Sequence, residues 1–395
     1  MVLLDELGGN QRQLNSGSAD VRSSKIRLIT DNEVSPSEGL SVDEALANLA
    51  PTRSEHDSQT LRLYTYANHA LLVGRYQRIE SEINLSAMQN EPLVKLNRRP
   101  TGGGTILMGS DQLGIAFTYQ ANDTWSPRES LRDFGHAISF ALSSLGIDAR
   151  LRGKNDLEVN GKKICGLGIY KDKSGGVLNH ASILFDLDYE LLLRMLAIPN
   201  VKLAAHRSQN ISTRLTTISA ELGRGISPVE VVDLVARSLG FYFGSKVSKS
   251  TLTDEESALA QDLRTTKYET NDWIFSRTLN KDLEHVSIPI RTKIGTLEVS
   301  LELQSQLIKS AIITGDFNLF TSELALIESY LKWQLLERNV LLSRLKDIRE
   351  SVAHIIEVED LIQALCTAEA RSEISSPIRI GSCYIPEESH VANSI

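Results

Sequence analysis

The chain has 395 residues, and its formal net charge at pH 7 is −8. This length predicts two packed units, and the excess of acidic residues excludes a general nucleic-acid binder, because non-specific phosphate binding needs an excess of Lys and Arg. The chain has three widely spaced cysteines, which fit neither a disulfide framework nor a cysteine-rich zinc site. An acidic N-terminus and the lack of an apolar run of about 20 residues predict a cytoplasmic protein with no signal peptide and no membrane span.

The first part of the chain predicts a flexible extension followed by an α/β unit. Residues 1–23 are polar, with too little apolar surface to offset the entropy of ordering. Alternation from Lys25 to Ile29 predicts a strand, and Ser41-Val42-Asp43-Glu44 matches a capping box that opens a helix. Strand-like runs then follow at 61–66, 70–73, 93–98 and 114–119. Together these runs predict one mixed sheet.

Two further helices and two strands complete this unit. Ser126-Pro127-Arg128-Glu129 is a capping box with Pro at the first helical position, and apolar residues at helical spacing continue to Gly146. Strands are expected at 163–170 and 181–187, and a capping box at Ser227 predicts a helix to about Leu239. The first domain is expected to span residues 24–248.

The rest of the chain predicts a smaller domain over residues 249–371. Alternating runs at 286–290, 296–303 and 307–313 precede helical periodicity over 323–345 and 359–370. This order predicts a small sheet followed by helices. Residues 372–395 contain Ser, Pro and Glu without periodicity and predict a mobile tail.

Three consecutive glycines follow a basic strand end. Arg98 and Arg99 precede them, and Thr101 adds a hydroxyl donor. Glycines let the backbone bring its N–H groups against a phosphate or carboxylate, although an ordinary turn is the plain alternative. The spacing matches neither a Walker A loop nor a dinucleotide fingerprint. The segment therefore predicts an anion-binding loop of another kind.

The segment from Gly153 to Gly168 predicts a hairpin that turns at Asn160-Gly161. Its second strand carries Lys163 and Cys165, which alternation places on one face, and glycines at 166 and 168 keep the strand surface open for a ligand. A solvated lysine run is the plain alternative, and the flanking glycines argue against it.

The segments from Arg98 to Thr105, Asn155 to Leu157 and Gly161 to Gly166 resemble, in order and spacing, the motifs of the lipoate-protein ligases. The resemblance covers about residues 24 to 371. It implies an α/β fold, a mixed-sheet biotin/lipoate-ligase catalytic domain similar to the class II synthetase cores, followed by a small α+β accessory domain. It also implies that the accessory domain repositions over the adenylate site.

The implied reaction is activation of lipoate or octanoate by ATP, with Mg²⁺, to the acyl-adenylate, and then transfer of the acyl group to a lysine of an acceptor protein. The resemblance assigns catalysis to Lys163, and Asp156 is also a candidate magnesium ligand. It assigns adenylate or lipoate binding to Arg98, Arg99, Thr101, Gly102, Gly103, Gly104, Thr105, Asn155, Asp156, Cys165, Gly166 and His180.

The chain departs from the family pattern at two positions, and these departures keep other interpretations of its function open. Many family members have a His-Asp pair where this chain has Met108-Gly109, which motivates a non-catalytic protein that binds lipoate or a lipoylated domain. An octanoyltransferase of the same fold uses a cysteine thiol without ATP, but Val177 stands at the expected cysteine position. Cys165 is then the alternative nucleophile, although a small packed residue is the more common role of such a cysteine. The Gly-Arg-Gly-Arg loop typical of biotin ligases is absent from the chain.

The resemblance implies a lipoyl-acceptor protein as partner. The candidates are the glycine-cleavage H protein, a dehydrogenase E2 lipoyl domain and a lipoate-binding protein of sulfur oxidation. Neither nucleic acid nor a membrane is expected as a partner, and the chain is expected to be a monomer.

Overall fold

The computed structural model describes residues 25–53, 59–153, 155–197, 213–277, 284–292, 295–317, 321–349 and 356–370. The expected N-terminal extension at 1–23 and tail at 372–395 lie outside these ranges. No helix in the described ranges is long and apolar enough to cross a membrane.

The first domain is built on an eight-stranded mixed sheet with the order β11-β1-β2-β6-β10-β9-β8-β7. β1 runs parallel to β2 and β11, and the other neighbours are antiparallel. The alternating sequence runs thus form one mixed sheet, as predicted. Its strands are β1 (Lys25–Val34), β2 (Gln59–Tyr66), β6 (Gln112–Gln120), β7 (Arg150–Arg152), β8 (Asp156–Val159), β9 (Lys162–Lys171), β10 (Gly176–Leu184) and β11 (Lys246–Lys249).

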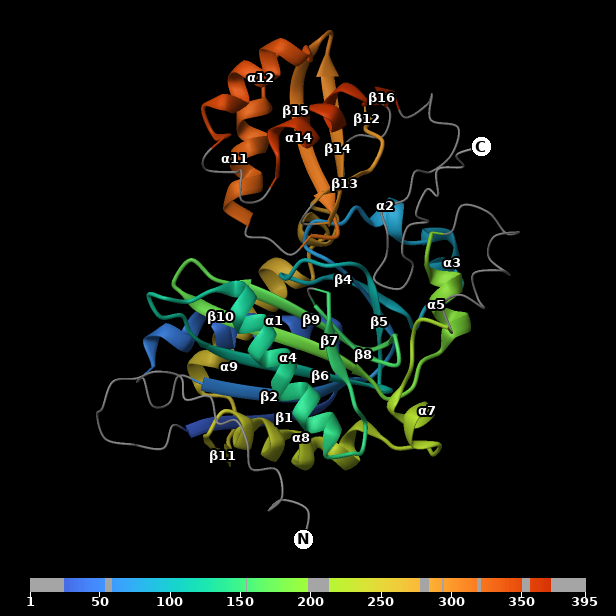
Figure 1. Ribbon diagram of the computed structural model, residues 1–395, viewed down its shortest axis with the longest axis vertical. Helices are drawn as coiled ribbons and strands as arrows, with labels where there is room; N and C mark the ends of the chain where they lie inside the picture. The colour runs from blue at the N-terminus through green and yellow to red at the C-terminus, as the bar shows by residue number, and fades with distance from the viewer. Residues whose placement is uncertain are drawn as a thin grey trace.

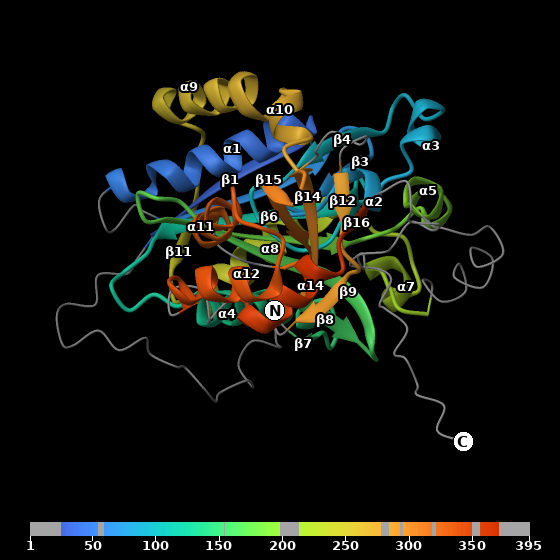
Figure 2. The same cartoon turned by 90° about the horizontal axis from the view of Figure 1, so that it is seen from above.

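Helices cover both faces of this sheet (Figure 2). On one face, α4 (Pro127–Ser143) and α8 (Pro228–Tyr242) bury their apolar sides in the largest core cluster. On the other, α1 (Pro36–Leu49) lies between the sheet and α9 (Asp254–Leu263). The predicted cap at Ser126 is confirmed, because its side chain accepts a hydrogen bond from Glu129 N, and the capping box at Ser227 is also present.

The predicted start of the first helix is wrong. The helix begins at Pro36 and not at Ser41, because Ser35 Oγ accepts from Glu38 N and Pro36 occupies the first helical position. Ser41 is buried inside the helix, where its hydroxyl donates to Glu38 O. The segment thus holds two Ser-x-x-Glu patterns, at 35–38 and 41–44, and the proline at 36 selects the earlier one.

A second, three-stranded sheet carries the segment around the glycines. β3 (Ala70–Val73) lies between β4 (Lys95–Arg98), to which it is parallel, and β5 (Ile106–Met108). The glycine loop therefore joins the two outer strands of this sheet. Three short helices share a core cluster with this sheet: α2 (Ile79–Glu82), α3 (Leu85–Gln89) and α5 (Tyr189–Met195). Of the other short helices, η1 (Ala50–Thr52) packs on β6 and β10, and α7 (Ile218–Leu222) packs in the main core cluster.

Residues 246–277 pack on the first domain, although the second was expected to begin at 249. β11 extends the large sheet, α9 packs on α1, and Arg27 forms an ion pair with Glu256 of α9 at 2.9 Å. The π-helical turn η2 (Arg264–Tyr268) and α10 (Asn271–Ile274) then lead towards the second domain. The packing therefore puts the physical boundary nearer residue 277.

The second domain is a small sheet covered by helices, in the predicted order, and lies at the top of Figure 1. The helical periodicity at 323–345 forms two helices and not one, with Trp333 between them at φ 62°. The elements are β12 (Glu284–Val286), β13 (Ile290–Thr292), β14 (Gly295–Gln304), β15 (Leu307–Gly315), α11 (Thr321–Leu331), α12 (Arg338–Lys346), α14 (Val358–Cys366) and β16 (Glu369–Ala370).

Candidate active site

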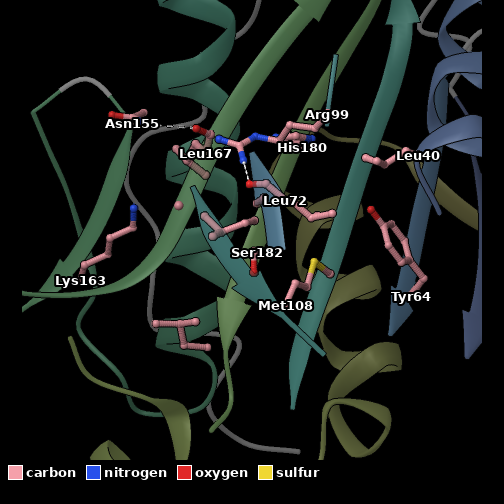
Figure 3. Close-up of a pocket in the computed structure, with 14 residues that line it drawn as sticks. Leu40, Tyr64, Leu72, Arg99, Met108, Asn155, Lys163, Leu167, His180 and Ser182 are labelled. Carbon is pink, nitrogen blue, oxygen red and sulfur yellow. Dashed lines mark hydrogen bonds between the residues drawn. The ribbon is translucent and has the colours of Figure 1, made fainter. Parts of the chain in front are cut away.

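One pocket lies where the large sheet, the small sheet and α1 meet (Figure 3). Its lining has a polar side with Lys163 and Asn155, and an apolar side with Met108, Tyr64 and Leu40. The lining residues are Leu40, Tyr64, Leu72, Arg99, Ile106, Met108, Asn155, Lys163, Gly166, Leu167, His180, Ala181, Ser182 and Leu184. The division suits an elongated ligand with a charged head and an apolar tail.

The glycine loop is held from inside by Arg99. The buried guanidinium donates to Leu72 O at 2.6 Å, to Gly102 O at 3.0 Å and to Gly104 O at 2.6 Å. Gly103 has φ 89°, a conformation that favours glycine. The carbonyl oxygens of the loop therefore bind the Arg99 guanidinium. These hydrogen bonds fix the shape of the loop before any anion binds.

Arg98 lies outside the pocket lining and joins three segments. Its fully buried side chain donates to the carbonyl oxygens of Gly74, Arg75, Gln77 and Ile274. These carbonyls belong to the turn after β3 and to α10, so Arg98 fixes the turn and the linker against the start of the glycine loop. Burial, with Arg75 and Arg277 nearby, lowers the pKa of Arg98.

Lys163 is a buried cation aimed into the pocket. Its Nζ lies 2.8 Å from Asp156 Oδ1, and a side-chain atom added at Gly166 would meet Nζ at 3.1 Å. Its backbone is fixed on the other side, where its N–H donates to Arg214 O at 2.8 Å and its carbonyl accepts from Thr216 N at 2.9 Å. The glycine at 166 thus provides the space through which the lysine reaches the pocket.

Lys163 and Cys165 do not share a face, although simple alternation predicts that they do. The pairing of β8 with β9 shifts between Leu157 and Glu158, so that Ile164 is an extra residue on β9. Such a β-bulge interrupts the alternation of side chains. Cys165 therefore packs in the main core cluster, where burial raises the pKa of its thiol to about 12 despite the nearby lysine.

His180 lies in the pocket as a neutral imidazole. Its Nε2 is 2.9 Å from Thr101 Oγ1, which ties β10 to the glycine loop. Burial, together with the charge of Arg99, lowers its pKa to about 3. A side-chain atom at Gly168 would come within 2.4 Å of this nitrogen, so the ring needs the glycine beside it.

The apolar side of the pocket is closed by Met108 and Tyr64. Both pack over Gly114, where an added side-chain atom would meet each of them at 2.7 Å. The Tyr64 hydroxyl donates to Asp43, whose other oxygen accepts from Arg62 at 2.7 Å. Tyr64 is therefore a fixed wall, whereas Met108 is an unbranched and adaptable side chain.

The structure brings together part of the set expected from the sequence. Arg99, Asn155, Lys163, Gly166 and His180 line the pocket. The expected residues that support the lining from behind it, or lie away from it, are Arg98, Thr101, Gly102, Gly103, Gly104, Thr105, Asp156 and Cys165. Sequence reasoning missed the apolar residues of the tail side, because they come from separate strands and α1 and carry no local signal.

The sequence matches two family models. Residues 35–240 match the lipoyl protein ligase A/B catalytic domain, and residues 285–365 match the bacterial lipoate protein ligase C-terminus. The chain belongs to the lipoyl protein ligase A/B family. This family includes lipoate-protein ligases and octanoyltransferases, and the resemblance seen in the sequence is confirmed.

Curated relatives of both kinds are similar to the chain. Octanoyltransferase LipM of Brevibacillus brevis is 32% identical over 281 residues, which cover 64% of this chain and 99% of that protein. Lipoate-protein ligase LplJ of Bacillus subtilis is 24% identical over 297 residues, covering 74% and 86%.

Solved structures confirm the expected fold. A bipartite lipoate protein ligase of Thermoplasma acidophilum has a TM-score of 0.59 at 25% identity, covering 65% of this chain and 98% of that chain. LipL1 of P. falciparum, solved in complex with lipoate, has a TM-score of 0.66 at 18% identity, covering 86% and 100%. The catalytic domain is thus of the lipoate-ligase type, followed by an accessory domain.

Proposed function

We propose that this chain is an ATP-dependent lipoate–protein ligase. Lipoate or octanoate attacks the α-phosphate of ATP, giving the acyl-adenylate and pyrophosphate; an acceptor lysine then attacks the acyl carbon and releases AMP. The observation that supports this most directly is the buried Lys163 ammonium at the polar side of the pocket, beside the pre-shaped glycine loop.

The position of Lys163 suits adenylate formation. A carboxylate and a phosphate repel each other, and a compact ammonium between them neutralises both. Asp156 holds that ammonium in place at 2.8 Å. In the described ranges, no three His, Cys, Asp or Glu side chains cluster as a metal cage. Mg²⁺ usually binds through one or two carboxylates plus phosphates, so Asp156 would suit as a protein ligand of an ion that arrives with the nucleotide.

Buried positive charge near the loop suits a polyphosphate substrate. The Arg75 guanidinium lies 4.1 Å from the centre of the Trp273 ring. Its backbone N–H donates to Thr101 O at 2.9 Å, which ties it to the glycine loop. Burial and the nearby Arg277 both lower the pKa of Arg75. A bound anion would relieve this repulsion.

Thioester chemistry of the octanoyltransferase kind is the second candidate, because LipM of Brevibacillus brevis is 32% identical. Two observations favour the ligase. Of the three cysteines in the chain, Cys165 is packed in the core with a raised pKa and Cys366 lies in α14 of the accessory domain, so neither supplies a thiol to the pocket. Cys383 lies outside the described residues. The LipM match spans 99% of that protein but 64% of this chain, which in addition carries the ligase C-terminal domain.

Cys165→Ala is expected to leave ATP-dependent acyl transfer within about threefold of the unsubstituted chain, because the thiol is buried away from the pocket. Its loss should cost only about 1 kcal/mol of stability through the small cavity left behind. The measurement is the mass of an acceptor domain after incubation with lipoate and ATP. Acylation from an octanoyl carrier protein without ATP, lost in Cys165→Ala, would instead establish the thioester route.

Met108→Ala is expected to lengthen the acyl pocket, because Met108 closes its apolar side over Gly114. The ratio of kcat/KM for decanoate to that for octanoate should rise about tenfold, the scale on which apolar pockets discriminate methylene groups. Competition between the two acids, read by acceptor mass, checks this. Met88→Ala, in α3 and outside the pocket lining, is the matched control. An unchanged ratio in Met108→Ala would show that another residue sets chain length.

A lipoyl-acceptor protein is the proposed partner. The similar Thermoplasma acidophilum ligase was solved in a study that pairs it with its E2 lipoyl domain. The deciding experiment offers lipoate, ATP and each candidate acceptor in turn: H protein, E2 lipoyl domain and a sulfur-oxidation lipoate-binding protein. Lipoate-dependent pyrophosphate release supports the ligase. No release, with lipoate still bound, would support a non-catalytic binding protein.

A further inference from the structure

The segment that joins the two domains, residues 264–277, binds the strand that leads into the glycine loop. β4 is an outer strand of the three-stranded sheet, so one of its edges has no neighbouring strand in the described part of the chain. The helix α10 of this linker packs beside β4 (Figure 2). Asn97 Nδ2 of β4 donates to Tyr268 O of the linker at 2.9 Å. Polar backbone groups at an open sheet edge need partners, and the linker supplies them.

Two reciprocal hydrogen bonds join the end of β4 to α10. The Trp273 indole Nε1 donates to Arg98 O at 2.7 Å, and Arg98 Nε donates in return to Ile274 O at 2.9 Å. Arg98 is the last residue of β4 and immediately precedes Arg99, whose guanidinium holds carbonyl groups of the glycine loop. The position of Arg98 O therefore sets where the loop begins.

The Trp273 ring also contacts two cations. Its centre lies 4.1 Å from the Arg75 guanidinium carbon and 4.0 Å from Lys267 Nζ. The face of an aromatic ring attracts a cation. Lys267 is fixed independently, because its Nζ donates to both carboxylate oxygens of Glu44 at 2.7 Å. Arg75 has no ion pair with any described residue, so the ring is the contact that orients its guanidinium.

The turn that carries Arg75 touches the glycine loop. Arg75 N–H donates to Thr101 O at 2.9 Å, and the neighbouring Gly74 lies against Gly103 O. Trp273 is therefore joined to the loop in two ways. It binds the strand end at Arg98, and it binds the side chain of the turn that holds Thr101.

We propose that Trp273 is a positioning residue for the glycine loop, which holds Arg98 O through its indole N–H and the Arg75 guanidinium through its ring. The linker is then part of the catalytic unit and does more than connect the accessory domain. Loss of the indole N–H leaves the buried Arg98 carbonyl without its partner, so the end of β4 opens more often. The consequence for catalysis rests on the proposed function: a loosened loop binds ATP more weakly, while the acyl pocket, which Trp273 does not line, is unchanged.

The first test examines the loop in the full chain without ATP or lipoate, so its outcome does not depend on the proposed function. Amide hydrogen exchange over residues 98–105 should be about tenfold faster in Trp273→Phe, which keeps a ring for Arg75 but cannot donate to Arg98 O. Trp273→Leu, which also lacks the ring, should exchange faster again. Trp333→Phe, at an exposed tryptophan of the accessory domain, is the matched control and should exchange like the unsubstituted chain.

The second test compares the two substrates in Trp273→Phe. The KM for ATP in lipoate-dependent pyrophosphate release should rise about tenfold, while the dissociation constant of lipoate measured alone should stay within about twofold. A purely structural role would lower the melting temperature without separating the two ligands.

Unchanged loop exchange in Trp273→Leu would overturn the proposal, and so would an equal weakening of ATP and lipoate. If Trp273→Leu does not fold, the exchange of Trp273→Phe decides in the same way. Absence of pyrophosphate release from the unsubstituted chain would instead contradict the proposed function, and the exchange measurement would still decide the role of Trp273.

Discussion

Lys163→Ala is expected to reduce acyl-adenylate formation by about a thousandfold or more. Removal of a single neutral donor to developing charge costs about 10² to 10³ in rate, and Lys163 supplies a full charge between two anionic groups. The fold should survive the change, because the backbone bonds of Lys163 to Arg214 and Thr216 remain and its partner Asp156 is 32% exposed, so that water can solvate the carboxylate left behind. The measurement is lipoate-dependent pyrophosphate release at saturating ATP.

Lys162 provides the matched control, because it is the adjacent lysine on β9 and does not line the pocket. Lys162→Ala should keep nearly full activity. Lys163→Arg should recover only part of the rate, since a planar guanidinium does not replace a compact ammonium in a space bounded by Gly166. Adenylate formation by Lys163→Ala within tenfold of the unsubstituted chain would remove Lys163 from the chemistry.

Sequence periodicity predicted the longer strands and the helices α4, α8 and α14, because each signal is local, but it missed the short helices α2, α3 and α5 and the capped helix α9. The Ser126 and Ser227 caps and the Asn160-Gly161 turn are of this kind; both turn residues have positive φ, at 50° and 79°. The errors arose where two local signals compete, as at Ser35 and Ser41, or where a single residue interrupts a pattern. Trp333 is the latter case, since its left-handed backbone divides an otherwise continuous helical periodicity.

The sequence predicted those residues of the candidate site that lie in short motifs. Lys163, Arg99 and Asn155 were found because they lie in short segments with recognisable spacing. The opposite orientation of Cys165 was not, because a bulge depends on pairing with β8 and leaves no mark in the sequence of β9. The roles of the two arginines were also inaccessible: the chain shows two adjacent cations, and only the fold reveals that both bind backbone carbonyls.

Gly74→Ala is expected to distort the glycine loop, because the two segments touch at this position. An added methyl group would lie 1.9 Å from Gly103 O, which is a backbone atom and cannot rotate away. Gly74 is itself fixed, since its N–H donates to Gln77 Oε1 at 2.8 Å and its carbonyl accepts from Arg98. Relief of the overlap therefore requires the loop to move.

The variant should lose about 2 kcal/mol or more of stability, the usual scale for overpacking in a rigid environment. It should also form adenylate about a hundredfold more slowly, since a displacement of about 1 Å at a site that positions reactants has that effect. Thermal unfolding and pyrophosphate release measure the two effects. The matched control is Gly225→Ala, where the added methyl group meets nothing within 4 Å. If the two variants behaved alike, the close approach of the β3 turn to the loop would not be what shapes this site.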